Sequence, residues 1–88
     1  MSTDLLNRLE KAITRYERKE YSEHDFHTTL ESIIQTITES DLADFRDFLF
    51  GQEANLERID FLINDENKRE EYLKVIEQIK ESIARRHI

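Results

Sequence analysis

The fold is decided first by residues 21–37, which read YSEHDFHTTLESIIQTI. Ser22 is a residue type that accepts a backbone hydrogen bond at the start of a helix. Asp25 follows three positions later, where its carboxylate can reach back to the Ser22 amide, and Tyr21 and Phe26 occupy the two positions of a hydrophobic staple. The pattern predicts a helix that begins at Ser22.

The apolar residues of this helix recur at steps of three and four, which places them on one face. That face comprises Phe26, Leu30, Ile33, Ile34 and Ile37. An earlier stripe with the same spacing predicts a first helix, capped by Thr3 or Asp4. Its members are Leu5, Leu9, Ala12, Ile13 and Tyr16.

A third and a fourth helix are predicted downstream. Thr38 and Asp41 repeat the cap arrangement, with Ile37 and Leu42 as the staple pair. Gly51 is the single glycine of the chain and is placed to end the third helix in a left-handed conformation. The third stripe is Leu42, Phe45, Phe48 and Leu49, and the fourth is Leu56, Ile59, Leu62 and Ile63.

The polar run from Asn64 to Arg69 interrupts the apolar pattern and predicts a turn. Asn67 together with Glu70 can then cap a last helix. Its stripe is Tyr72, Ile76, Ile79 and Ile83, flanked by Leu73 and Val75.

The composition agrees with a small helical protein. The 88 residues are 38% hydrophobic and 38% charged and include no proline, which is too apolar for a disordered chain and too poor in turn residues for a β-sandwich. Amphipathic helices joined by short connections bury their stripes against one another. We therefore predict one all-α domain over residues 1–88, a small antiparallel bundle of four to five amphipathic helices.

No segment fixes a reaction or a cofactor. The absence of cysteine excludes a thiol nucleophile and a thiolate metal site, and one glycine is too few for a phosphate-binding loop. The 20 acidic residues are so numerous that no pair of them stands out as a catalytic acid and base. We therefore expect no catalytic residue, no cofactor and no enzymatic activity.

Two histidines raise the question of a metal site. His24 and His27 are three positions apart, and His27 and Glu31 are four apart, so each pair can share a helix face. Such a site usually needs a further ligand from elsewhere in the fold. The simpler interpretation is that both histidines are solvated near the helix start, and no metal site is predicted.

The formal net charge of −7 disfavours binding to nucleic acid, whose phosphates would be repelled. No stretch approaches the length of about 18 apolar residues typical of a membrane span. The first residues also lack the basic start and apolar run of a secretory signal. These features predict a cytoplasmic protein that binds neither nucleic acid nor membranes.

Charge is unevenly distributed along the chain. Residues 20–66 contain thirteen acidic and two basic residues, a net charge of −11, whereas residues 1–19 and 67–88 each carry +2. Within the acidic region, Phe50 lies roughly 80° from Leu42 and Phe61 about 140° from Leu56 on an ideal helix. Neither ring therefore lies on an apolar stripe. Two interpretations remain: the rings are exposed anchors for a partner, or they close the core where the helices bend.

Two functional hypotheses follow. The first is an inhibitor of the immunity-protein or antitoxin type, which neutralises a basic, nuclease-like toxin domain through an acidic face. The residues predicted to bind this partner are Asp41, Asp44, Asp47, Phe50, Glu53, Glu57, Asp60 and Phe61. The alternative is a structural or adaptor module of a larger complex that self-associates, for example as a homodimer. High salt should weaken the first kind of binding and leave the second nearly unchanged.

Overall fold

The computed structural model describes residues 2–86 of the chain, with side chains from residue 4 onward. This part contains four α-helices, one 3-10 turn and no strand, which confirms the all-helical prediction. The elements are α1 (Ser2–Glu17), α2 (Glu23–Gln35), η1 (Ser40–Leu42), α3 (Ala43–Leu62) and α4 (Asp65–Arg86). Among these helices none combines the length and the apolar character that a bilayer crossing requires.

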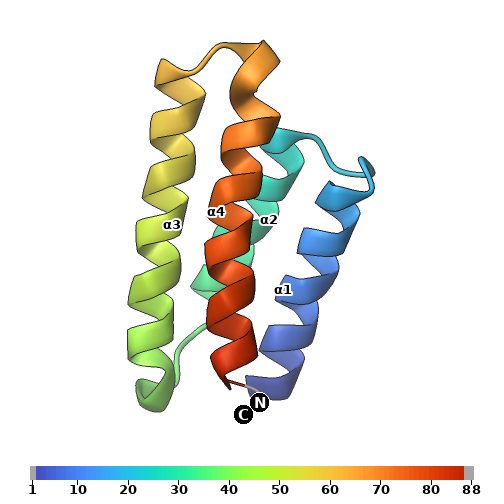
Figure 1. Ribbon diagram of the computed structural model, residues 1–88. Helices are drawn as coiled ribbons and strands as arrows, with labels where there is room; N and C mark the ends of the chain where they lie inside the picture. Colours follow the sequence, from blue (N-terminus) through green and yellow to red (C-terminus); the bar gives the residue numbers. More distant parts are fainter. Residues whose placement is uncertain (1, 87–88) are drawn as a thin grey trace.

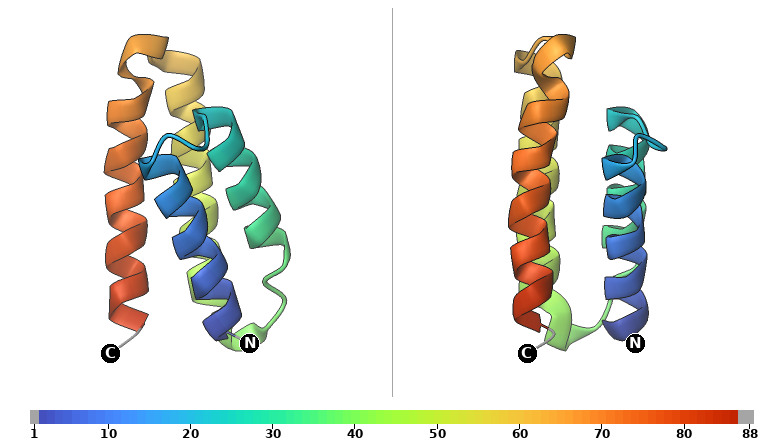
Figure 2. Two further views of the ribbon diagram at one scale, coloured as in Figure 1. Left: turned by 90° about the vertical axis from the view of Figure 1, so that its right-hand side faces the viewer. Right: turned by 45° about the vertical axis from the view of Figure 1, so that its right-hand side comes forward.

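The helices form two hairpins that pack face to face. The chain reverses direction from each helix to the next, and both ends of the chain lie at the same end of the molecule (Figure 1). One layer is made of α1 and α2 and the other of α3 and α4 (Figure 2). The closest packing is within each hairpin, and α2 against α3 is the main contact between the layers. The α3–α4 hairpin projects beyond α1 and α2 at its connecting end (Figure 2).

Three aromatic rings from three helices meet in the core. The Phe26 ring lies 5.5 Å from Tyr16 and 6.5 Å from Tyr72, measured between ring centroids, and the two tyrosine rings lie 5.8 Å apart. Their hydroxyl groups are satisfied at the edge of the core, where Tyr16 donates to Glu23 and Tyr72 to Asp60. Because buried polar groups need partners, these bonds allow tyrosine to fill the interior.

The start of α2 is the boundary that the sequence predicts best. The Ser22 hydroxyl accepts a hydrogen bond from the Asp25 amide at 3.1 Å, and the Asp25 carboxylate accepts one from the Ser22 amide at 3.2 Å. The capping box is therefore confirmed. The predicted start of the first helix is wrong, because α1 already begins at Ser2 and both Thr3 and Asp4 lie inside it. The side chain of Thr3 lies outside the described part.

The start predicted at Thr38 is also wrong. The chain is extended at Glu39, passes through the short turn η1, and enters α3 at Ala43. Neither η1 nor α3 has a side-chain hydrogen bond at its N-cap. Ile37 and Leu42 are nevertheless both buried, so the connecting segment itself carries this apolar pair into the core.

The predicted third and fourth helices are one continuous helix. Gly51 has no positive φ and lies within α3, so it does not end a helix. Gln52 fills the stripe position between Leu49 and Leu56 and is buried. Its side-chain amide donates to Gln78 of α4 at 3.2 Å, which satisfies a polar group that would otherwise be costly to bury. The stripe is therefore continuous, although a polar residue interrupts its sequence pattern.

Gly51→Ala is expected to raise the free energy of unfolding by about 0.5 to 1 kcal/mol, because glycine is a poor residue in a helix interior. A Cβ at this position would meet nothing within 4 Å, so no clash opposes the gain. The measurement is chemical denaturation followed by circular dichroism. Ala54→Gly, one turn further along the exposed side of α3, should cost a similar amount. A loss of stability in Gly51→Ala would contradict the continuous helix.

The connection between α3 and α4 is shorter than predicted. Only Ile63 and Asn64 separate the two helices, and α4 begins at Asp65, ahead of the predicted cap residue Asn67. The polar run 64–69 therefore forms mostly the first turns of α4. Acidic residues there interact favourably with the N-terminal end of the helix dipole.

Candidate functional site

The outward side of α3 carries exposed aromatic residues. Phe50 is 50% and Phe61 89% exposed, so neither ring closes the core. Their role as anchors for a partner stays a prediction. They are eleven positions apart, which on an ideal helix places them about 20° apart around the axis and about 16 Å apart along it. Exposed residues of this face form what we call the α3 outer stripe: Asp47, Phe50, Ala54, Glu57 and Phe61.

The other predicted contact residues lie away from this stripe. Asp41 belongs to η1, and Asp44, in the first turn of α3, lines a groove with Arg86 near the end of α4. Glu53 and Asp60 are directed toward α2, where both contact the same histidine. The eight predicted residues thus separate into a central stripe, an acidic end and a pair that faces a neighbouring helix.

One apolar residue on α3 is more exposed than predicted. The fourth apolar stripe predicts Leu62 in the core, but this side chain is 72% exposed. It lies in the last turn of α3, where the α3–α4 hairpin extends past α1 and α2 (Figure 2), and it lines a shallow groove with Ile59 and Val75. No helix of the other layer covers this end.

His27 is buried between α2 and α3, with 8% of its surface exposed. Its Nε2 lies 2.7 Å from Glu53 Oε2, and its Nδ1 lies 3.1 Å from Asp60 Oδ2. Glu31, one turn along α2, brings Oε1 to 3.5 Å from the same Nε2. The prediction that both histidines are solvated is therefore wrong for His27, while His24 is exposed as predicted.

A signal for this burial is present in the sequence. His27 precedes Leu30 by three positions and Ile34 by seven, so it continues their stripe at the spacing of an inward face. A polar residue at such a position needs partners from another helix. Because these partners, Glu53 and Asp60, are 26 and 33 positions away, their identity is not visible in the local pattern.

The protonated form of His27 fits its surroundings. Only an imidazolium can donate from both ring nitrogens, and each nitrogen here faces a carboxylate. Burial lowers the pKa of His27, but the hydrogen bonds and charges of Glu53 and Asp60 raise it by more, so the pKa lies above its usual value of 6.5. The pair of acids therefore stabilises a buried positive charge.

The Asp60 carboxylate is itself held in place by α4. Tyr72 donates its hydroxyl to Asp60 Oδ1 at 2.8 Å, while Asp60 Oδ2 faces His27. Burial of Tyr72 raises the pKa of its hydroxyl, and Asp60 raises it further, so the hydroxyl stays protonated as a donor. The result is a polar chain from Tyr72 through Asp60 and His27 to Glu53, which joins three helices.

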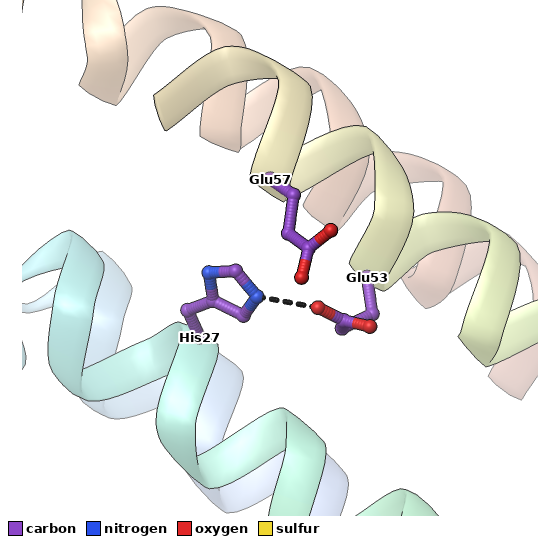
Figure 3. Close-up of side chains that lie close together, drawn as sticks. All are labelled: His27, Glu53 and Glu57. Atoms are coloured by element: carbon purple, nitrogen blue, oxygen red, sulfur yellow. Dashed lines mark hydrogen bonds and ion pairs between the residues drawn. The ribbon is translucent and has the colours of Figure 1, made fainter. Parts of the chain in front are cut away.

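Three side chains of this region could hold a metal ion. His27, Glu53 and Glu57 each direct one potential ligand atom into the same space (Figure 3). These atoms all lie within 4.8 Å of one another, and no other group of this kind is found in the described part of the chain. Glu53 and Glu57 are one turn apart on α3, opposite His27 and Glu31, which are one turn apart on α2.

Tertiary packing brings acidic residues of α2 and α3 together at the contact between the two helices. The side chains of α2 include no lysine or arginine, and those of α3 include only Arg46 and Arg58. Where α2 and α3 pack against each other, Glu31 of α2 and Glu53 and Asp60 of α3 all contact His27. A cationic ligand or partner would meet the strongest attraction there.

Comparison of the chain with models of known protein families, with curated proteins and with solved structures gives no match in any of the three.

Proposed function

We propose that the chain is a non-enzymatic protein-binding module that binds a basic protein through the α3 outer stripe. The observation that carries this proposal is the exposure of Phe50 and Phe61 on one helix face among carboxylates. Large aromatic side chains are frequent anchors at protein interfaces because they bury much surface with few rotatable bonds. Here they are spaced along the same side of a rigid helix.

The carboxylates of α3 indicate that the partner is basic. Carboxylates around exposed rings attract basic surfaces over a distance and repel nucleic acid and other acidic proteins. Proteins that act on nucleic acids have basic clefts, because they must bind phosphates. We therefore propose an inhibitor of the immunity-protein or antitoxin type, which covers the cleft of a nuclease-like toxin in the cytoplasm.

The dimensions of α3 suit such an interface. A helix of 20 residues is about 30 Å long, comparable with the width of a standard protein interface. In this proposal Phe50 and Phe61 are anchors, while Asp44 and Asp47 contribute charges at the rim. Glu53 and Asp60 do not contact the partner directly, because their carboxylates already bond to His27. They contribute to the negative potential that attracts it.

The double charge reversal Asp44→Lys and Asp47→Lys is expected to abolish partner binding and leave the helical circular dichroism spectrum unchanged. Both side chains are exposed, and Asp47 makes a weak 3.8 Å ion pair with Arg46. Reversal removes the attraction and introduces repulsion toward a basic partner. Binding that survives the reversal would refute the acidic-face proposal.

The matched control changes the net charge equally at another place. Glu70→Lys with Glu77→Lys reverses two exposed acids on α4, and neither of them lines the groove that contains Asp44. This control should retain most of the affinity. Equal losses in both double variants would indicate a general charge effect and no defined site.

The rings are tested in the same binding assay. Partners are first captured with the tagged protein from its native cytosol at low salt, identified by mass spectrometry and purified. Phe50→Ala with Phe61→Ala should then weaken binding about a hundredfold or more, since anchor residues typically contribute about 2 kcal/mol or more each. Association should also slow as salt is raised.

The alternative of self-association uses the same exposed rings but brings two chains of net charge −7 together. Recovery of the protein alone, as a defined oligomer that persists at high salt, would favour that alternative. A basic partner bound in a fixed ratio and released at high salt would favour the inhibitor, and inhibition of its nuclease activity would be the next measurement.

A further inference from the structure

We propose that His27, Glu53 and Glu57, with Glu31 as a fourth ligand, form a binding site for one divalent first-row transition-metal ion such as Zn²⁺. The site lies between α2 and α3 and shares only Glu57 with the α3 outer stripe. It does not depend on the protein-binding function, which can fail or hold independently.

The distances lie close to those of a metal site. Zinc binds imidazole nitrogen and carboxylate oxygen at about 2.0 to 2.2 Å, so two ligands of a tetrahedral ion are about 3.4 Å apart. Glu31 Oε1 already lies 3.5 Å from His27 Nε2. Glu53 Oε2, at 2.7 Å, would move outward by less than about 1 Å to admit the ion. Glu57 is exposed and free to swing inward from its position in Figure 3.

The helical spacing supports the same ligand set. Residues four positions apart on a helix lie on the same face, one turn apart. Two such pairs face each other here, His27 with Glu31 on α2 and Glu53 with Glu57 on α3. The packing of the two helices therefore brings ligand atoms of His27, Glu53 and Glu57 within 4.8 Å of one another, and Glu31 lies 3.5 Å from the same His27 nitrogen.

The histidine is also oriented as in known metal sites. A metal-bound histidine usually donates its other ring N–H to a carboxylate, which fixes the ring and its tautomer. Asp60 stands at Nδ1 in this role, 3.1 Å away, and is anchored in turn by the Tyr72 hydroxyl. This arrangement leaves Nε2 directed at the three glutamates.

Charge provides a reason for a cation to bind. Four carboxylates surround one imidazole, which supplies at most one positive charge, so at least three negative charges remain uncompensated. A divalent ion at the Nε2 position compensates more of them. The nitrogen ligand favours zinc-like ions over Mg²⁺ and Ca²⁺, which prefer oxygen ligands alone.

The test uses the full chain, free of tags and treated with a chelator, titrated with Zn²⁺ at neutral pH by calorimetry. We expect one ion per chain, a rise in melting temperature on binding, and a visible spectrum typical of tetrahedral coordination when Co²⁺ replaces Zn²⁺. Glu57→Gln should weaken binding at least tenfold without affecting the fold, because Glu57 is exposed. Asp60→Asn should weaken it by about 10- to 100-fold through the orientation of His27.

Two control variants separate a defined site from weak surface binding. His24→Ala removes the exposed histidine three positions away, and Glu39→Gln removes one exposed acid outside the cluster. Both should bind Zn²⁺ as the unmodified chain does. Absence of saturable binding, equal affinity in Glu57→Gln, or loss of binding in His24→Ala would each overturn the proposal. Competition by Mg²⁺ at equal concentration would also overturn it, since it would indicate attraction to acidic charge alone.

Discussion

His27→Leu is expected to lower the free energy of unfolding by about 2 to 4 kcal/mol in the metal-free protein. The substitution removes the partner of two carboxylates at a helix interface and leaves their negative charges close together, which is costlier than losing a hydrogen bond between neutral groups. The Asp60 side chain is 34% exposed, so water moderates the loss. Urea denaturation near pH 6 is the measurement.

His24→Leu is the matched control for this change. The same residue type is replaced on the same helix, but His24 is exposed, so the effect should stay within about 0.5 kcal/mol. Adding Glu53→Leu to His27→Leu should restore part of the lost stability, because one unpaired charge is then removed. Similar losses at both histidines would show that the interface of α2 and α3 does not depend on the buried imidazolium.

The contribution of His27 should also depend on pH. Because its pKa is raised in the folded state, its stabilising effect is complete below the unfolded value of about 6.5 and is lost as pH rises through the higher folded value. The groups that face it are Glu31 from α2, Glu53, Glu57 and Asp60 from α3, and Tyr72 hydrogen-bonded to Asp60 from α4.

The measurement compares the unmodified chain with His27→Leu in the presence of a chelator. The difference in their free energies of unfolding should shrink as pH rises above about 6.5. A difference that grows over this range would mean that the folded protein favours neutral His27.

Phe26→Ala is expected to have the largest effect of any single change considered, a loss of about 3 to 5 kcal/mol. Phe26 is fully buried and contacts both Tyr16 and Tyr72, so truncation leaves a cavity where three helices meet. For a chain of this size, such a loss is a large share of the total stability. We expect a lower melting temperature and partial unfolding in dilute denaturant.

Phe50→Ala makes the same chemical change on the surface. Half of the Phe50 side chain is already exposed, so stability should change by less than about 1 kcal/mol while partner binding is weakened. A comparable loss of stability in the two variants would contradict the assignment of Phe26 to the core and Phe50 to the outer stripe.

Local pattern was sufficient for much of the fold. The capping box at Ser22 and the apolar stripes of α1, α2 and α4 follow from residues within a few positions of one another, and they are found as predicted. The structure differs from the prediction where a residue bonds to a partner that is distant in the sequence. Gln52 interrupts the stripe of α3 in the sequence, but its bond to Gln78 lets it occupy a core position, and the helix continues through Gly51.

For the candidate sites, too, some features follow from local sequence and others depend on packing between helices. The amino-acid sequence by itself determined the all-helical class, the acidic middle region and the position of Phe50 and Phe61 off the stripes, because each depends on composition or helical period. Only the tertiary structure decided that these rings are exposed and that His27 lies among the carboxylates of α3. The physical reason is that burial and ion pairing depend on which helix packs alongside, and the helical period within one segment carries no information about its neighbour.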